Sequence, residues 1–539
     1  MKKIYAEKIK DAKGEIENAE NLLKEKELQI GLRERATTKL KGFSHIVLDF
    51  GKEISGGVRI LTYRVKGNKR VRLRFGESLT ESCAEIGEKN ATNDHALRDM
   101  TVELQDLSDM KFGDTGFRFF RIDTLSEDTG LELKSIVAEI EETEREASGK
   151  FESNDELLNE IWETAAYTLK LCLRNGYFWD GVKRDRLVWI GDLYPEMKAA
   201  QSLYKEIPEI ENSLRNARNQ AEKGEWINNI PMYSMWWLIV LGEYYKYSGA
   251  ERFVREELPY IKELIKQLGS YVDEEGETKF EYNFIDWPTH YEEGEPEEKK
   301  WDEYIGINYL LRIALNKTGG MLKEIGEGDS DAEEVLKRLC KKSYKVKRYK
   351  QIAALGVWSG ERTEHNREVL LNGGAEGVST FMSYEILTAL GEYGEYEKAL
   401  EILKDYYGGM LRLGATTFWE DFDVKWQEGA SRIDEFPKEG EKDIHGDYGA
   451  FCYKGFRHSL CHGWSAGVLS YLSETVLGLK PEGTGFRRIR FEPKPWGLEY
   501  AKGILPTPYG EIEAEWHMTK EGKLEKKILR APKEIEIVG

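Results

Sequence analysis

The chain has 539 residues, too many for one ordinary domain, and 40% of them are apolar, enough to form a sizeable core. Its formal net charge of −19 argues against nucleic acid and anionic membranes as partners, because both are held mainly by Lys and Arg. Neutral ligands carry no such penalty, and the 14 tryptophans and 28 tyrosines provide rings that can stack on sugars.

The cysteines predict a reducing compartment. They are odd in number, sparse and without a CxxC pair, at Cys83, Cys172, Cys340, Cys452 and Cys461. No apolar run follows the basic N-terminus, and no stretch approaches 18 uncharged apolar residues, so we expect neither a signal peptide nor a membrane span. The expected location is the cytoplasm. The sequence does not determine the oligomeric state, and a homo-oligomer is one of the alternatives.

The residue pattern of the chain changes near residue 44. Residues 1–43 are dense in Lys and Glu and predict a charged helical segment, either a solvated surface helix or a partner-binding arm. Residues 44–148 contain short alternating runs such as IVLDFG, GVRILTYRV and FRFFRID. No helix-length segment separates them, so we predict an N-terminal antiparallel β-sandwich rather than parallel βαβ units.

From 149 to 480 the apolar period becomes helical. Ser153 and Glu156 match a capping box, which predicts a helix start there. Further helices are expected at 195–207, 233–249, 253–268, 302–320, 332–343, 379–391, 396–410 and 465–478. No fixed repeat of a solenoid is present, so we predict a closed helical toroid that gathers its loops at one end. Residues 481–539 return to strand patterns and predict a small C-terminal β-domain.

Three loops of the helical region combine carboxylates with tryptophans. A sugar site needs both, since an indole stacks on the pyranose and a carboxylate takes its hydroxyls. For any single loop, a structural ion network or a core tryptophan beside a surface acid is the competing interpretation. The candidate residues are Asp180, Arg184, Asp185, Trp189 and Asp192 in the first loop, Asp286 and Trp287 in the second, and Trp419 and Glu420 in the third.

No metal or cofactor is expected. His458 and His462 stand four residues apart, but the chain has only eight histidines and lacks the further ligands of a zinc site. A histidine that binds a sugar hydroxyl fits this position better. The fingerprints of dinucleotide, P-loop and serine-hydrolase sites are absent from the sequence.

Taken together, these segments resemble the α-L-rhamnosidases of glycoside hydrolase family 78. DGVKRDRLVWIGD is similar to the family's general-acid loop, GATTFWE to its later GATT-x-W-E segment, and SLCHGWSAG to its His-containing segment. FIDW and YSMWW resemble its G-D-W loop and its substrate-facing aromatic helix. The strand-rich segments LDFGKEISGGVRI and TPYGEIEAEW resemble its N- and C-terminal β-domains, so the resemblance covers nearly the whole chain.

The resemblance implies a fold and a set of roles. The fold is mainly α: an (α/α)6 barrel flanked by an N-terminal β-sandwich and a small C-terminal β-sandwich domain. Glu420 is the implied general base, and Asp185 stands where the family has its acidic Glu. Asp180 and Asp192 match carboxylates that bind sugar hydroxyls, and Trp189, Trp236, Trp287 and His462 match substrate-lining positions. One departure concerns Asp185, which is a methylene shorter than Glu; a misplacement of this size costs about a hundredfold in rate unless the backbone compensates.

The sequence therefore predicts a glycosidase that removes terminal α-L-rhamnosyl or related deoxy-sugar residues from an oligosaccharide or a rhamnosylated small molecule. Asp185 would protonate the leaving oxygen, and Glu420 would activate water for inversion. Two alternatives stay open: an inverting (α/α)6 hydrolase of another sugar, and a carbohydrate-binding pseudoenzyme. A helical scaffold for protein partners would explain none of the tryptophan–acid loops.

Overall fold

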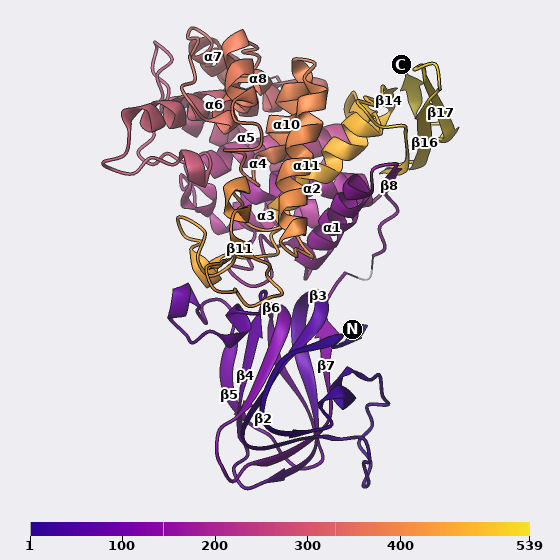
Figure 1. Cartoon of the computed structure of the whole chain (residues 1–539). Helices are drawn as coiled ribbons and strands as arrows, with labels where there is room; N and C mark the ends of the chain where they lie inside the picture. The colour runs from indigo at the N-terminus through magenta and orange to yellow at the C-terminus, as the bar shows by residue number, and fades with distance from the viewer. Residues whose placement is uncertain (1, 144, 329) are drawn as a thin grey trace.

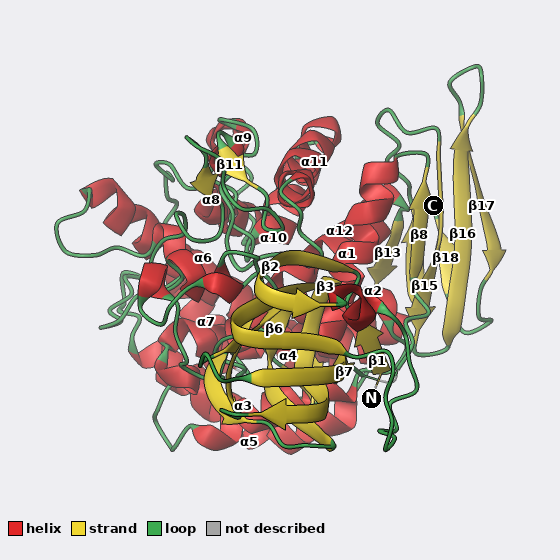
Figure 2. Ribbon diagram, turned by 60° about the horizontal axis from the view of Figure 1, so that its bottom comes forward, coloured by secondary structure: helices red, strands yellow, loops and turns green. Residues whose placement is uncertain are grey.

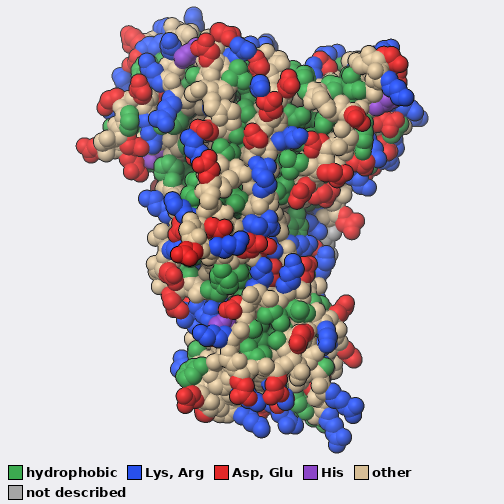
Figure 3. Space-filling model, viewed as in Figure 1, with side chains coloured by type: hydrophobic (Ala, Val, Ile, Leu, Met, Phe, Trp, Pro, Cys, Tyr) green, Lys and Arg blue, Asp and Glu red, His purple; other side chains and the backbone are tan. Residues whose placement is uncertain are grey.

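The computed structural model describes residues 2–143, 145–328 and 330–539. An N-terminal β domain lies at one end, a helical barrel lies at the other, and a smaller β region lies beside the barrel (Figure 1). Both signs of charge are scattered over the face drawn in Figure 3, which shows no broad surface of a single sign.

The N-terminal β domain is one antiparallel sheet that curves around its own core. Its order is β1-β7-β3-β6-β4-β5, with β2 paired to β3. Phe75 packs edge-on against Phe117 and Phe120 inside it. Figure 2 shows β2, β3, β6 and β7 curving in front of the barrel helices. The strands are β1 Lys2–Tyr5, β2 Lys8–Glu17, β3 Thr38–Lys66, β4 Arg70–Gly76, β5 Asp99–Glu103, β6 Ser108–Thr124 and β7 Gly130–Ile140.

The prediction of a helical segment at 1–43 is wrong. This stretch forms β1 and β2, followed by a short 3-10 turn at Ala19–Leu23. Ile9 and Ile16 pack against the core of the β domain, and Leu22 is fully buried in it. The Lys- and Glu-rich composition suggested a solvated helix. In the structure the segment forms strands whose apolar side chains face the core, while the neighbouring charged side chains remain in water.

The helices form an (α/α)6 barrel, as predicted. Among the described residues, α2, α4, α6, α8, α10 and α12 contact one another in a closed ring, and α1, α3, α5, α7, α9 and α11 pack around it. The bounds are α1 Glu156–Cys172, α2 Ile190–Leu203, α3 Pro208–Gln220, α4 Pro231–Ser248, α5 Glu251–Ser270, α6 Glu297–Glu324, α7 Ser330–Leu339, α8 Lys350–Trp358, α9 Glu364–Leu371, α10 Ser383–Glu392, α11 Tyr396–Arg412 and α12 Val468–Tyr471.

Inner and outer helices differ in sequence for a physical reason. The inner helix α4 is apolar nearly all round because it is covered on every side, whereas the outer helix α5 buries one stripe and exposes charges. Pro231 begins α4, and Gly249 ends it at a φ of 67°, which favours glycine. Across the part of the chain that the structure describes, no helix is both long and apolar enough to cross a bilayer.

Two boundaries differ from the sequence prediction. Helix α1 is capped by Asp155, whose side chain accepts from the N–H groups of Leu157 and Leu158; Ser153 instead ends the strand β8 (Lys150–Ser153). This strand pairs with β15, so residues assigned to the barrel belong to the C-terminal β region (Figure 2). That region has two sheets, β13-β14-β18 and β17-β16-β15-β8. Its strands are β13 Leu479–Glu482, β14 Arg488–Phe491, β15 Tyr500–Thr507, β16 Gly510–Met518, β17 Leu524–Arg530 and β18 Glu536–Val538.

Candidate active site

The barrel brings the three tryptophan–acid loops to one end. The loop at 179–189 leads into α2, the loop at 284–289 precedes α6, and the loop at 414–421 follows α11. The segment at 458–463 lies beside them, because Gly181 pairs with His462 and the Glu420 N–H donates to the Ser459 carbonyl. This end faces the N-terminal β domain, whose Glu77 contacts Ser459 and Leu460.

Arg184 joins the two proposed catalytic carboxylates. Its Nη1 lies 3.0 Å from Asp185 Oδ1, and its Nη2 forms a short ion pair with Glu420 Oε1. The second oxygen of Glu420 accepts from the Ser459 N–H at 3.2 Å. Arg184 and Glu420 are both buried, so this contact is little screened by solvent. The two carboxylates therefore lie on either side of one guanidinium group.

Asp185 is held by an unusual backbone and by the β domain. Asp185 and Arg186 both have positive φ, 55° and 59°, in the left-handed region that side chains seldom adopt. The Asp185 N–H donates to His95 Nδ1 at 2.6 Å, and the same ring nitrogen lies 2.9 Å from Asp185 Oδ1. Arg186 is anchored separately through Asp114. The loop is thus built to hold the shorter acid from two directions.

His462 lies between three carboxylates. Its Nε2 is 3.8 Å from Asp180 Oδ2 and 3.8 Å from Glu420 Oε1, and its Nδ1 is 3.9 Å from Asp192 Oδ1. Burial lowers the pKa of His462 well below its usual value, so the ring is neutral at physiological pH. At these distances the ring makes no direct hydrogen bond to the carboxylates, so His462 does not compete with a ligand for their oxygens.

Several buried acids at this end of the barrel have raised pKa values. Burial raises the pKa of Asp180 and Asp192 well above the usual range, and each also faces other carboxylates. Burial likewise raises the pKa of Asp286 to about 6 and, helped by the charge of Asp286, that of Asp421 to about 7. Glu196 is buried nearby with a raised pKa and no partner for Oε1 within the described residues. Protonated carboxyls of this kind can donate hydrogen bonds to sugar hydroxyls.

The four candidate tryptophans occupy two environments. Trp189 and Trp287 are partly exposed; Trp189 packs edge-on against Tyr233, and Trp287 stacks on Phe451 at 5.8 Å. Trp236 and Trp419 are each only 1% exposed. The indole nitrogens of Trp189, Trp236 and Trp419 have no hydrogen-bond partner among the residues described. Trp189, Trp287 and Asp185 therefore mark the accessible side of the site.

Sequence reasoning missed a buried charge network behind the loop. Lys183 Nζ lies 2.9 Å from Glu77 Oε2 and 3.2 Å from Glu81 Oε1, and it donates to the Phe456 carbonyl. Glu77, Glu81 and His445 are close enough together to suggest a metal site, but the Lys183 ammonium already supplies the positive charge there. Lys183 stood in the quoted loop, whereas no motif marked Glu77, Glu81 or His95 in the β domain.

A closed ring of six helical hairpins with buried carboxylates, an arginine and tryptophans at one end defines the class of six-hairpin glycosidases. Models of known protein families match most of the chain. Residues 39–140 match the bacterial α-L-rhamnosidase concanavalin-like domain, residues 146–345 the six-hairpin glycosidase domain, and residues 478–535 the C-terminal domain of the same enzymes. The chain belongs to this α-L-rhamnosidase family, glycoside hydrolase family 78.

Individual relatives are distant. An α-L-rhamnosidase of Alteromonas sp. (strain LOR) is 25% identical over 537 residues, covering 88% of this chain and 54% of the relative. The chain spans about half the length of the curated relatives it matches. The family 78 rhamnosidase of Bacillus sp. GL1 superposes with a TM-score of 0.74 at 20% identity, over 96% of this chain and 55% of the other. The Klebsiella oxytoca rhamnosidase solved with rhamnose bound gives 0.64 at 18% identity, over 80% and 88%.

Proposed function

We propose that the chain hydrolyses terminal α-L-rhamnosides, with an oligosaccharide or a rhamnosylated small molecule as substrate. The observation that carries the proposal is the Asp185–Arg184–Glu420 bridge at the loop end of a six-hairpin barrel. Glycoside hydrolysis needs two carboxylates flanking the scissile bond, and this is the pair that matches the family's catalytic segments. The names of the relatives support rhamnose as the sugar.

In the proposed mechanism, Glu420 is the base. Its Oε1 is held by Arg184 and its Oε2 by the Ser459 N–H, so the carboxylate is oriented while unused lone pairs can accept a proton from water. Asp185 donates a proton to the leaving oxygen from the more exposed side. The protonated carboxyls of Asp180 and Asp192 and the ring of His462 bind the sugar hydroxyls.

The test is hydrolysis of p-nitrophenyl α-L-rhamnoside beside a panel of other aryl glycosides. We expect rhamnoside cleavage that Glu420→Gln lowers by about a hundredfold to ten-thousandfold, since this is what a positioned general base contributes. Selective cleavage of another glycoside would keep the two-carboxylate mechanism and replace the sugar. No cleavage of any glycoside, with L-rhamnose still bound in calorimetry, would favour a carbohydrate-binding protein that has lost catalysis.

We also propose that the protein works in the cytoplasm. All five cysteines are free, and the buried pair Cys172 and Cys461 interact as thiols. Thiols this close persist in a reducing compartment, whereas an oxidising one favours disulfides. Cell fractionation of the source organism tests the proposal; recovery of the protein outside the cytoplasm would contradict it.

A further inference from the structure

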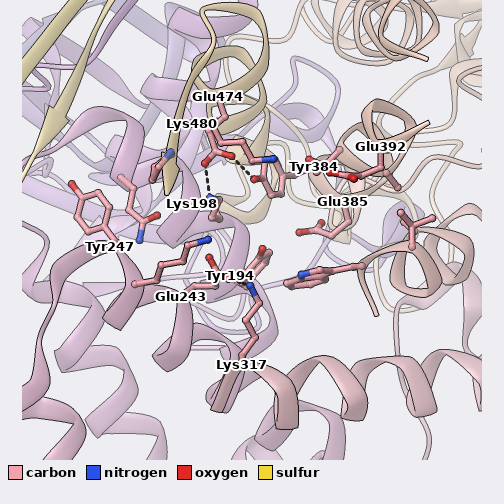
Figure 4. A pocket seen from close by; sticks show the side chains of 18 of the residues that line it. Tyr194, Lys198, Glu243, Tyr247, Lys317, Tyr384, Glu385, Glu392, Glu474 and Lys480 are labelled. Atoms are coloured by element: carbon pink, nitrogen blue, oxygen red, sulfur yellow. Dashed lines mark hydrogen bonds and ion pairs between the residues drawn. The ribbon is translucent and has the colours of Figure 1, made fainter. Parts of the chain in front are cut away.

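A separate cavity lies at the opposite end of the barrel from the tryptophan–acid loops. Its volume is about 370 Å³, within the range of roughly 300–1,000 Å³ that small-molecule sites occupy. The C-terminal halves of α2, α4 and α6 form part of its wall, and α8, α10 and the segment after α12 complete it. Figure 4 shows side chains from these elements pointing toward this space.

An aromatic layer divides this cavity from the candidate active site. Trp236 packs against Tyr194 at 5.1 Å, Phe381 at 5.7 Å and Trp358 at 6.1 Å. Phe381 in turn packs on Trp464 at 5.2 Å, next to His462. No proposed catalytic or sugar-binding residue lines the cavity. It is therefore a distinct site rather than an extension of the first.

The cavity gathers positive charge in an acidic protein. Lys198, Lys246, Lys317 and Lys480 line it, whereas Arg362 at its rim is paired with Glu392. Lys198 pairs with Glu474 at 2.6 Å, and Lys317 forms a short ion pair with Glu243. Within the described ranges, the side-chain ammonium groups of Lys246 and Lys480 form no ion pair or hydrogen bond. The ammonium groups of Lys246 and Lys480 are therefore without a direct counter-charge among the described residues.

The lowered pKa of Glu243 indicates the same excess of positive charge in the cavity. Although burial acts to raise its pKa, the charges of Lys317, Lys246 and Lys198 hold it at about 2. Glu243 therefore feels Lys246 in addition to its direct partner Lys317, while Lys198, which is paired with Glu474, adds a smaller effect. An anion entering the cavity would gain from this surplus.

Glu385 adds an unsatisfied polar group. It is 5% exposed on α10, and neither of its carboxyl oxygens has a partner in the described structure. Burial raises its pKa to about 8, so the neutral carboxyl can donate a hydrogen bond without cancelling the lysine charge. The Gln201 amide nitrogen also has no partner there. Buried groups of this kind gain most from a ligand that supplies the missing hydrogen bonds.

We propose that this cavity binds a small anionic polyol: a monosaccharide-sized molecule that carries hydroxyls and one carboxylate or phosphate group. Lys246 and Lys480 hold the anionic group. Glu385 and Gln201 bind hydroxyls, and the half-buried indole of Trp358 offers an apolar face for the carbon skeleton. The pairs Lys198–Glu474 and Lys317–Glu243 fix the wall on either side.

Calorimetry on the full chain tests the site with three probes: D-glucuronate, D-glucose 6-phosphate and neutral D-glucose. We expect at least one anionic probe to bind at a single site and about tenfold more tightly than glucose, because a hydrogen bond to a charged group adds this much. Whichever anionic probe binds identifies the carboxylate or the phosphate. Lys246→Gln and Lys480→Gln should each weaken this binding about tenfold. The matched control is Lys323→Gln, which makes the same charge change on α6 away from the cavity.

A cavity-filling variant locates the binding independently of charge. Thr388 lines the cavity on α10, and Thr388→Tyr should abolish binding while leaving the melting temperature near that of the parent. Binding that survives Thr388→Tyr, or that Lys323→Gln weakens as much as Lys246→Gln does, would overturn the proposal. So would the absence of binding by both anionic probes at about 10 mM, which is weaker than useful small-molecule recognition.

Discussion

The two ends of the barrel use charge in opposite ways. At the loop end, burial raises the pKa values of Asp180, Asp192, Asp286 and Asp421, and neighbouring carboxylates add to this effect at Asp180, Asp192 and Asp421. At the far end, lysines outnumber the ion-paired glutamates, and the pKa of Glu243 falls to about 2. The same ring of helices thus carries a proton-holding site and a cationic cavity, separated by the aromatic layer around Trp236.

The comparison also teaches what each end requires from its surroundings. The loop end is completed by the β domain, through Glu77, Glu81 and His95. The far end is built from barrel helices, the segment after α12 and the start of β13, which supplies Lys480. Changes to contacts with the N-terminal β domain should therefore act on the loop end alone.

The largest expected effect is on stability at Lys183. Lys183→Met would leave Glu77 and Glu81 buried without their counter-charge, which should lower the free energy of unfolding by about 3–5 kcal/mol. Lys246→Met at the far end removes no direct pair and should cost less than about 1 kcal/mol. Chemical denaturation measures both. Equal losses would erase the contrast between the two ends.

The next largest effect concerns Asp185, the proposed general acid. Asp185→Asn should lower kcat/KM by about a hundredfold or more for alkyl rhamnosides, whose leaving groups need a proton. The loss should be much smaller for p-nitrophenyl rhamnoside, whose leaving group departs unaided. Glu420→Gln should affect both substrates alike. A loss in Asp185→Asn that ignores the leaving group would assign the acid to another residue, with Asp192 the next to substitute.

A smaller effect is expected at the domain contact. His95→Ala should lower kcat about tenfold with KM nearly unchanged, because the ring positions Asp185 and is itself partly exposed. His95→Asn keeps an acceptor for the Asp185 N–H and should restore part of the rate. If both variants match the parent enzyme, the loop holds Asp185 without the β domain.

The last effect is a change in pH dependence. Burial raises the pKa of Asp421 from its ordinary 3.8 to about 7 in the folded chain. Its stabilising contribution is therefore complete below pH 3.8 and is lost as the pH rises through 7. Melting temperatures of Asp421→Asn should fall less steeply over this interval than those of the parent. Parallel curves would mean that Asp421 is ionised when folded.

The sequence predicted the parts that lie in continuous patterns. The inner helices α2, α4, α6, α10 and α12 and the loops around Asp185 and Glu420 were predicted because helical periodicity and local motifs encode them. The helices α8 and α9 were not identified because they are short, and α3 because few of its residues are apolar, so the helical period is a weak signal in all three. The strands β1 and β2 lie in a segment predicted to be helical, because its Lys- and Glu-rich composition is a more prominent feature than the spacing of its few apolar residues. His95 and Glu385 could not be found, since their roles exist only once distant elements pack together.

The most direct measurement is the anomeric configuration of the first sugar released, followed by proton NMR during hydrolysis of an α-L-rhamnoside. We predict β-L-rhamnose as the initial product, with the α anomer appearing only by later mutarotation, because Glu420 activates water on the face opposite the leaving group. Initial release of α-L-rhamnose would show that a carboxylate attacks the sugar directly, and would contradict Glu420 as a base acting through water.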